Sequence, residues 1–159
     1  MVRVGIGFDV HKLASGRDLV IGGVKIANEK GLFGHSDADV LLHAIIDALL
    51  GAAALGDIGS HFPDTDERWK NADSRRLLAH VGNLIREAGF AVNNVDGTVV
   101  LERPRLSSYV EEMRKQIALE LGIQLSQVSV KATTSERIGF VGREEGAMAY
   151  AVCAIENRK

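Results

Sequence analysis

The segment His35–Gly59, HSDADVLLHAIIDALLGAAALGDIG, predicts a helix that begins at Ser36 and ends at Gly51 or Gly56. Apolar residues cover nearly every face of this helix, which is typical of a helix buried in a protein core. Three polar residues interrupt the apolar surface at i, i+4 spacing and lie one above another: Asp39, His43 and Asp47. Because burial of such groups without partners is costly, we expect each to pair with a metal or with another polar group. This polar stripe is the first indication of a functional site.

The sequence on either side of this helix predicts strands and two further helices. The first ten residues alternate between apolar and small or polar side chains, which predicts a strand with one buried face. Its apolar residues are Val2, Val4, Ile6 and Phe8. The other predicted elements are a strand pair at 19–26, helices at 75–87 and 107–121, and strands at 92–101, 128–132 and 147–155.

This order of elements predicts an α+β fold in which right-handed crossovers place the helices on one face of a single mixed sheet. We expect a two-layer, ferredoxin-like sandwich and a single domain over residues 1–159. The other face of the sheet would be open, and its simplest cover is another copy of the same chain.

Composition and charge narrow the classes of partner and the compartment. A net charge of -2 gives no reason to expect a nucleic acid or an anionic membrane as a partner. The single cysteine, Cys153, excludes an internal disulfide framework and suits a reducing cytosol. The start of the chain lacks a signal-peptide pattern, and His43 and Asp47 interrupt the most apolar helix, which argues against a membrane span. We therefore expect a cytoplasmic protein.

A metal site is the first candidate for chemistry. Asp9 and His11 point to the same side of the first strand, and His43 lies on the buried helix. Two imidazoles and one carboxylate are a common ligand set for catalytic zinc with one open position. The alternative is that Asp9 and His11 lie on a solvent-exposed strand end and that His43 is a core histidine. Asp47, one turn after His43, is expected to orient its ring.

Residues 130–146, VKATTSERIGFVGREEG, form a second candidate. Their cationic and hydroxyl donors suit a polyphosphate, and Glu136 is placed to hold a divalent cation against it. These donors are Lys131, Thr133, Thr134, Ser135 and Arg143. A Walker A sequence is missing, so this is not a P-loop, and a strand followed by a polar turn is the alternative explanation. A third candidate is the turn Arg103-Pro104-Arg105, in which proline exposes backbone groups that could bind a base.

Five separated motifs give the chain a close resemblance to a known family. They are Gly7-Phe8-Asp9-Val10-His11, Gly34-His35-Ser36-Asp37 through His43, Leu55-Gly56-Asp57-Ile58-Gly59, Phe62-Pro63-Asp64-Thr65-Asp66, and Val130-Lys131-Ala132-Thr133-Thr134. In this order and over essentially the whole length, the chain resembles the 2-C-methyl-D-erythritol 2,4-cyclodiphosphate synthase family of the non-mevalonate isoprenoid pathway.

The resemblance implies a homotrimer of ferredoxin-like protomers, with the sheets lining the trimer interior and the active sites between subunits. The implied substrate is 4-diphosphocytidyl-2-C-methyl-D-erythritol 2-phosphate, a cytidine diphosphate derivative. Its 2-phosphate would attack the β-phosphorus, so that CMP leaves and a cyclic diphosphate forms. Such a reaction depends on positioning and charge neutralisation and needs no protein nucleophile.

The resemblance also implies roles for individual residues. The zinc ligands would be Asp9, His11 and His43, and Glu136 would help to hold magnesium or manganese. His35 and Thr134 resemble the family's transition-state stabilisers. The implied substrate contacts are Asp9, Val10, His11, His35, Ser36, Asp57, Ile58, Gly59, Phe62, Pro63, Asp64, Thr65, Asp66, Leu101, Pro104, Arg105, Leu106, Ser107, Thr133, Thr134, Ser135, Glu136, Phe140 and Arg143.

Three positions depart from the family's pattern. Arg105 stands where lysine is common, Ser135 replaces a frequent threonine, and Tyr150 occupies a position where many relatives carry glutamate near the trimer cavity. Two other functions are compatible with the same residues. One is a zinc-dependent phosphohydrolase, and the other is a trimeric zinc- or nucleotide-binding module without turnover.

Overall fold

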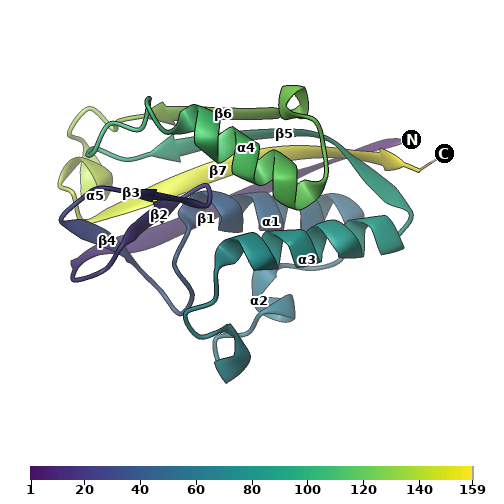
Figure 1. Ribbon diagram of the computed structural model, residues 1–159, viewed down its shortest axis with the longest axis horizontal. Coiled ribbons are helices and arrows are strands. Elements are labelled where there is room, and N and C mark those ends of the chain that lie inside the picture. The colour runs from purple at the N-terminus through teal and green to yellow at the C-terminus, as the bar shows by residue number, and fades with distance from the viewer. Residues whose placement is uncertain (159) are drawn as a thin grey trace.

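A computed structural model of the chain describes residues 1–158. It has a five-stranded mixed sheet and a helical layer that covers one face of this sheet (Figure 1). The strands are β1 (Val2–Ser15), β2 (Leu19–Ile21), β3 (Val24–Ile26), β4 (Lys30–Phe33), β5 (Phe90–Val100), β6 (Val128–Thr133) and β7 (Gly146–Asn157). The helices are α1 (Val40–Ala53), α2 (Ile58–His61), α3 (Ser74–Glu87), α4 (Val110–Leu121) and α5 (Gly139–Gly142), with 3₁₀ turns at Glu67–Trp69 and Leu125–Gln127.

The strand order β4-β1-β7-β5-β6 confirms the predicted mixed sheet. β7 pairs antiparallel with both β1 and β5, whereas β5 and β6 are parallel. The predicted strand pair around Gly22-Gly23 is confirmed as the separate hairpin β2–β3. The two predicted helices correspond to α3 and α4, and Asp73 caps the first of them.

The central helix α1 begins later than predicted. Asp39, and not Ser36, is its N-cap, because the Asp39 carboxylate accepts the free N–H groups of Leu41 and Leu42. Residue Ala54, with a left-handed φ of 58°, follows the helix, so the predicted end at Gly51 or Gly56 is also wrong. The prediction that α1 is buried on nearly every face is confirmed, since twelve of its residues are buried.

The predicted buried face of β1 is the wrong one in the single chain. Val4 and Ile6 are 66% and 72% exposed, whereas Gly5 and Gly7 are buried. The physical reason is the close approach of α1: a Cβ atom at Gly5 would overlap the carbonyl oxygen of Ala48, and the same holds at Gly7 for Ala44. The helix therefore lies directly on the glycine side of the strand, and the large apolar side chains point away from it.

A candidate metal centre and two cavities

The structure brings the three predicted metal ligands together where β1 passes the first turn of α1. The Asp9 Oδ2 atom lies 2.9 Å from His11 Nε2 and 3.1 Å from His43 Nδ1, and these two nitrogens are 3.2 Å apart. A tetrahedral zinc ion with bonds of about 2.0–2.1 Å would separate its ligand atoms by roughly 3.3 Å. The donor set and its spacing therefore fit a divalent metal ion.

The charges of this group also suit a cation. Burial raises the pKa of Asp9, but hydrogen bonds from His11 and His43 outweigh burial and lower it to about 2. Burial lowers the pKa of His11, and the Asp9 carboxylate outweighs this effect and raises it. Asp9 is thus a carboxylate at neutral pH and offers a negative charge to whatever lies between the two imidazoles.

The expectation that Asp47 orients His43 is wrong. The Asp47 carboxylate accepts the N–H of Ile58 at 2.8 Å and so anchors the start of α2. Both ring nitrogens of His43 face other groups, and Nδ1 lies 3.1 Å from Asp9 Oδ2. Its Nε2 atom instead lies 2.9 Å from the Ser74 hydroxyl and 3.2 Å from the Ser36 hydroxyl. Ser74 carries no sequence motif that would have predicted this role.

A cavity of about 240 Å³ opens over the metal ligands. Its lining joins residues from β1, the segment before α1, α2 and the following loop: Asp9, His11, Gly34, His35, Ser36, His43, Ile58, Gly59, Phe62, Asp64, Trp69 and Leu77. Nine of these were predicted as metal ligands or substrate contacts, whereas Gly34, Trp69 and Leu77 were not. Five other predicted substrate contacts from the same part of the chain are not among the lining residues: Val10, Asp57, Pro63, Thr65 and Asp66. Asp57 caps α2, and Asp66 caps the 3₁₀ turn that follows.

The loop that carries His35 and Ser36 is held from behind by Arg17. Its guanidinium donates to the carbonyl oxygens of Gly34 at 3.2 Å and Ser36 at 3.1 Å, on either side of His35. The Nε2 atom of His35 lies 3.4 Å from the carbonyl oxygen of Asp66. Arg17 therefore holds the loop of His35 in place, and the contact between His35 and Asp66 links this loop to the one that follows α2.

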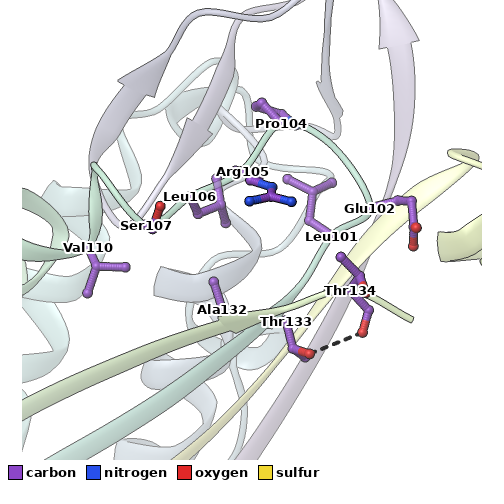
Figure 2. Close-up of a pocket in the computed structure, with 10 residues that line it drawn as sticks. All are labelled: Leu101, Glu102, Pro104, Arg105, Leu106, Ser107, Val110, Ala132, Thr133 and Thr134. Carbon is purple, nitrogen blue, oxygen red and sulfur yellow. Dashed lines mark hydrogen bonds between the residues drawn. The ribbon is translucent and has the colours of Figure 1, made fainter. Parts of the chain in front are cut away.

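A second cavity, of about 410 Å³, lies at the turn between β5 and α4 (Figure 2). It contains the predicted turn and the end of β6, together with three residues that were not predicted: Glu102, Val110 and Ala132. Figure 2 shows Leu101, Arg105 and Leu106 gathered over Ala132 and Thr133. Its complete lining is Leu101, Glu102, Pro104, Arg105, Leu106, Ser107, Val110, Ala132, Thr133 and Thr134.

The other predicted residues near this turn lie outside the second cavity. Ser135 donates its N–H to Glu102 at 3.3 Å, and Glu136 accepts from the Thr134 hydroxyl at 3.3 Å. Arg143 forms an ion pair with Glu145 at 2.8 Å. Phe140 is 36% exposed on α5.

The two cavities are separated by the width of the sheet. Val10 pairs with Met148, Met148 with Val100, and Val100 with Thr133, so Thr133 lies three strands from β1. With strands about 4.8 Å apart, this corresponds to roughly 14 Å. The metal ligands and the second cavity are therefore distinct regions of one chain.

The mixed sheet with helices on one face defines an α+β fold. The Asp-His-His group beside a cavity is typical of metal-binding proteins. A sequence model described as the YgbB family matches residues 2–156, and the chain belongs to that family. Among residues 1–158, no helix combines the length and the apolarity that a membrane crossing requires.

Known proteins similar to this chain agree with the family. A curated relative from Salinibacter ruber, 2-C-methyl-D-erythritol 2,4-cyclodiphosphate synthase, is 60% identical over 98% of this chain and 99% of its own length. The bifunctional IspDF from Campylobacter jejuni has a TM-score of 0.96 and 42% identity, and the match covers 100% of this chain and 43% of that one. IspF of Plasmodium falciparum, solved as a CDP complex, has a TM-score of 0.87 and 32% identity, with 99% and 97% covered.

Proposed function

We propose that this chain converts 4-diphosphocytidyl-2-C-methyl-D-erythritol 2-phosphate to 2-C-methyl-D-erythritol 2,4-cyclodiphosphate and CMP. The observation that carries the proposal is the Asp9, His11 and His43 group at the base of a cavity lined by His35 and Ser36. The curated relatives bear the name of this activity, and a relative of similar fold binds CDP. The chain is thus a lyase of isoprenoid biosynthesis that depends on a metal.

In this reaction an oxygen of the 2-phosphate attacks the β-phosphorus. The bond between the β-phosphorus and the bridging oxygen breaks, and CMP leaves with that oxygen. Both reacting groups belong to one molecule, so the protein contributes mainly by holding the two ends of the substrate together. Phosphoryl transfer also requires neutralisation of the charge that develops on the oxygens.

The residues of the first cavity would hold the phosphates and the methylerythritol chain. Zinc at Asp9, His11 and His43, when bound, supplies positive charge that polarises a phosphate oxygen. His35 and Ser36 would donate to the same phosphates, with Arg17 fixing their loop. Ile58, Gly59 and Phe62 line the same cavity and would exclude water from it when the substrate is bound.

The second cavity would hold the cytidine diphosphate. Backbone groups of the turn at Pro104–Ser107 would recognise the base, and the hydroxyls of Thr133 and Thr134 would contact the diphosphate. Glu136, next to these threonines, would help to hold magnesium or manganese against the diphosphate. Val10, Asp57, Pro63–Asp66, Ser135, Phe140 and Arg143 remain predicted substrate contacts.

We further propose a homotrimer with active sites between subunits. The open face of the sheet supports this proposal, because Val2, Val4 and Ile6 are 57%, 66% and 72% exposed there. The separation of the two cavities also supports it, since the metal centre of one subunit could meet the second cavity of its neighbour. A ferredoxin-like topology, a single domain over residues 1–159 and a cytoplasmic location belong to the same proposal.

Release of CMP tests the proposed activity directly. The purified, zinc-loaded protein is incubated with the substrate and magnesium, and the products are separated by chromatography. We expect equal amounts of CMP and cyclic diphosphate. Ring-opened phosphate products would identify a phosphohydrolase instead, and binding of CDP and zinc without product would identify a binding module. The variant His35→Ala should lose turnover while still binding zinc.

A further inference from the structure

Ser74 is a buried hydroxyl that links a metal ligand to a carboxylate. It is the first residue of α3 and is 0% exposed. Its Oγ atom lies 2.9 Å from Nε2 of His43 and 2.5 Å from Oδ1 of Asp37. Its backbone N–H also donates to Oδ2 of Asp37, at 3.1 Å. Both oxygens of the Asp37 carboxylate are therefore directed at Ser74.

The direction of the hydrogen bonds in this chain follows from the number of protons. A carboxylate only accepts, so the single hydroxyl proton of Ser74 goes to Asp37. The Ser74 oxygen then presents a lone pair to Nε2 of His43, and this nitrogen must carry the proton. With its proton on Nε2, a neutral imidazole has its free lone pair on Nδ1, the atom that faces Asp9 and His11.

We infer that Ser74 and Asp37 are positioning residues that fix the tautomer and the orientation of His43, so that Nδ1 is available to the metal. The inference rests on the proposed metal centre. Ser36 is less suited to this role, because its hydroxyl is farther from Nε2, at 3.2 Å, and also lines the substrate cavity. The Asp37–Ser74–His43 chain thus replaces the support expected from Asp47.

The same chain joins the metal centre to the loop that covers it. Asp37 donates its N–H to the carbonyl of Ala72 at 3.1 Å, and Asn71 donates to the carbonyl of His35 at 2.8 Å. The segment 71–74 is the base of the loop that carries Phe62, Asp64 and Trp69 into the cavity. A shift of this loop base would therefore act on the ring of His43 through Ser74.

Zinc affinity measured by competition with a chelator tests the inference without substrate. We expect Ser74→Ala to weaken zinc binding 10- to 100-fold, the usual effect of removing a hydrogen-bond partner of a ligand histidine. The matched control is Asp73→Ala, which removes the cap of the same helix, because Asp73 accepts the N–H of Arg75 and touches neither Ser74 Oγ nor His43. This control should bind zinc within twofold of the wild-type protein.

A second variant and a spectroscopic readout separate positioning from general destabilisation. Asp37→Asn keeps the shape of the side chain but offers only one acceptor oxygen, so we expect about a tenfold loss of zinc affinity even if Ser74→Ala folds poorly. Long-range ¹H–¹⁵N spectra of the zinc-loaded protein should show His43 protonated at Nε2, with no proton on Nδ1. In both variants a smaller fraction of the protein should show this pattern at the same zinc concentration.

The possible outcomes are distinguishable. A wild-type protein that binds no zinc would overturn the metal centre and this inference together. Zinc-binding wild-type protein with unchanged affinity in Ser74→Ala and Asp37→Asn would overturn the inference alone. An equal loss in Asp73→Ala would also overturn it, because the effect would then report the start of α3.

Discussion

On β1 and β7, the larger apolar side chains lie on the exposed face of the sheet, which is the reverse of what hydrophobicity alone predicts. The face under α1 has the small residues Gly5, Gly7 and Ala151, and these residues are buried. The opposite face has large apolar residues such as Ile6 and Val152, which are 72% and 44% exposed in the single chain. Small residues occur under α1 because the backbone of this helix comes close to the strands. The large apolar residues occur on the opposite face, which would need a partner to cover it.

The strongest test of this comparison is a charge on the open face. Ile6→Asp would bury three carboxylates in a trimer, at a cost of at least about 3 kcal/mol per subunit, more than a hundredfold each in association. We expect a folded monomer by sedimentation. Leu119→Asp is the matched control, since Leu119 is also 72% exposed but lies on α4. An intact trimer of Ile6→Asp would contradict the proposed use of this face.

A single side chain added at Gly7 is expected to disrupt the packing of α1 on the covered face of the sheet. Gly7→Val would place a Cβ atom on the carbonyl oxygen of Ala44, which belongs to the backbone of α1. Because neither backbone can move aside, we expect a loss of more than about 3 kcal/mol in the free energy of unfolding. Urea denaturation measures it, with Gly51→Ala as the control, since a Cβ atom there meets open space. Equal stability of the two variants would mean that α1 does not need the close approach.

Asp39 joins the start of α1 to the β2–β3 hairpin and so helps to hold the helix on the covered face of the sheet. Asp39 is 0% exposed and accepts N–H groups of Gly22, Gly23, Leu41 and Leu42 at 2.7–3.2 Å. Asp39→Ala would leave buried donors unpaired, so we expect a loss of about 2–3 kcal/mol by urea denaturation. Asp73→Ala, which removes the half-buried cap of α3, should lose only about 1 kcal/mol. Equal losses would show that the hairpin contacts add nothing.

The smallest effect is expected from the pH dependence of the metal-free protein. Hydrogen bonds lower the pKa of Asp9 from 3.8 to about 2, so Asp9 stabilises the folded state above pH 4. This contribution, at most about 2 kcal/mol, is lost as the pH falls from 4 towards 2. In the presence of a chelator, Asp9→Asn should flatten the acid limb of stability against pH. An unchanged limb would show that Asp9 is not paired in the metal-free state.

Much of the architecture could be predicted from the sequence, because periodicity and caps act locally. The strand pair within residues 19–26, the two further helices and the burial of the central helix are confirmed. The side of β1 that carries the helix could not be predicted, since alternation defines two faces but does not say which one another element approaches. Gly5 and Gly7 were the available signal, since residues without a side chain let another backbone come close.

The candidate site, like the fold, could be predicted only in part. Asp9, His11 and His43 could be grouped because their chemistry is selective for a metal, and the structure brings them together. The partner of His43 could not be predicted in the same way. Asp47 is near in sequence, but its carboxylate accepts the N–H of Ile58, whereas Ser74 is 31 residues away and reaches His43 only through the packing of α3.

The pairing of β7 between β1 and β5 has a consequence for how the chain is made. β7 is the last of the described strands to leave the ribosome, and it occupies the middle of the sheet. Until it emerges, β1 and β5 have no bridge between them, and the apolar side chains of the nascent β1 stay open to other chains. The sheet is therefore expected to be completed only once β7 has been synthesised and can pair with both β1 and β5.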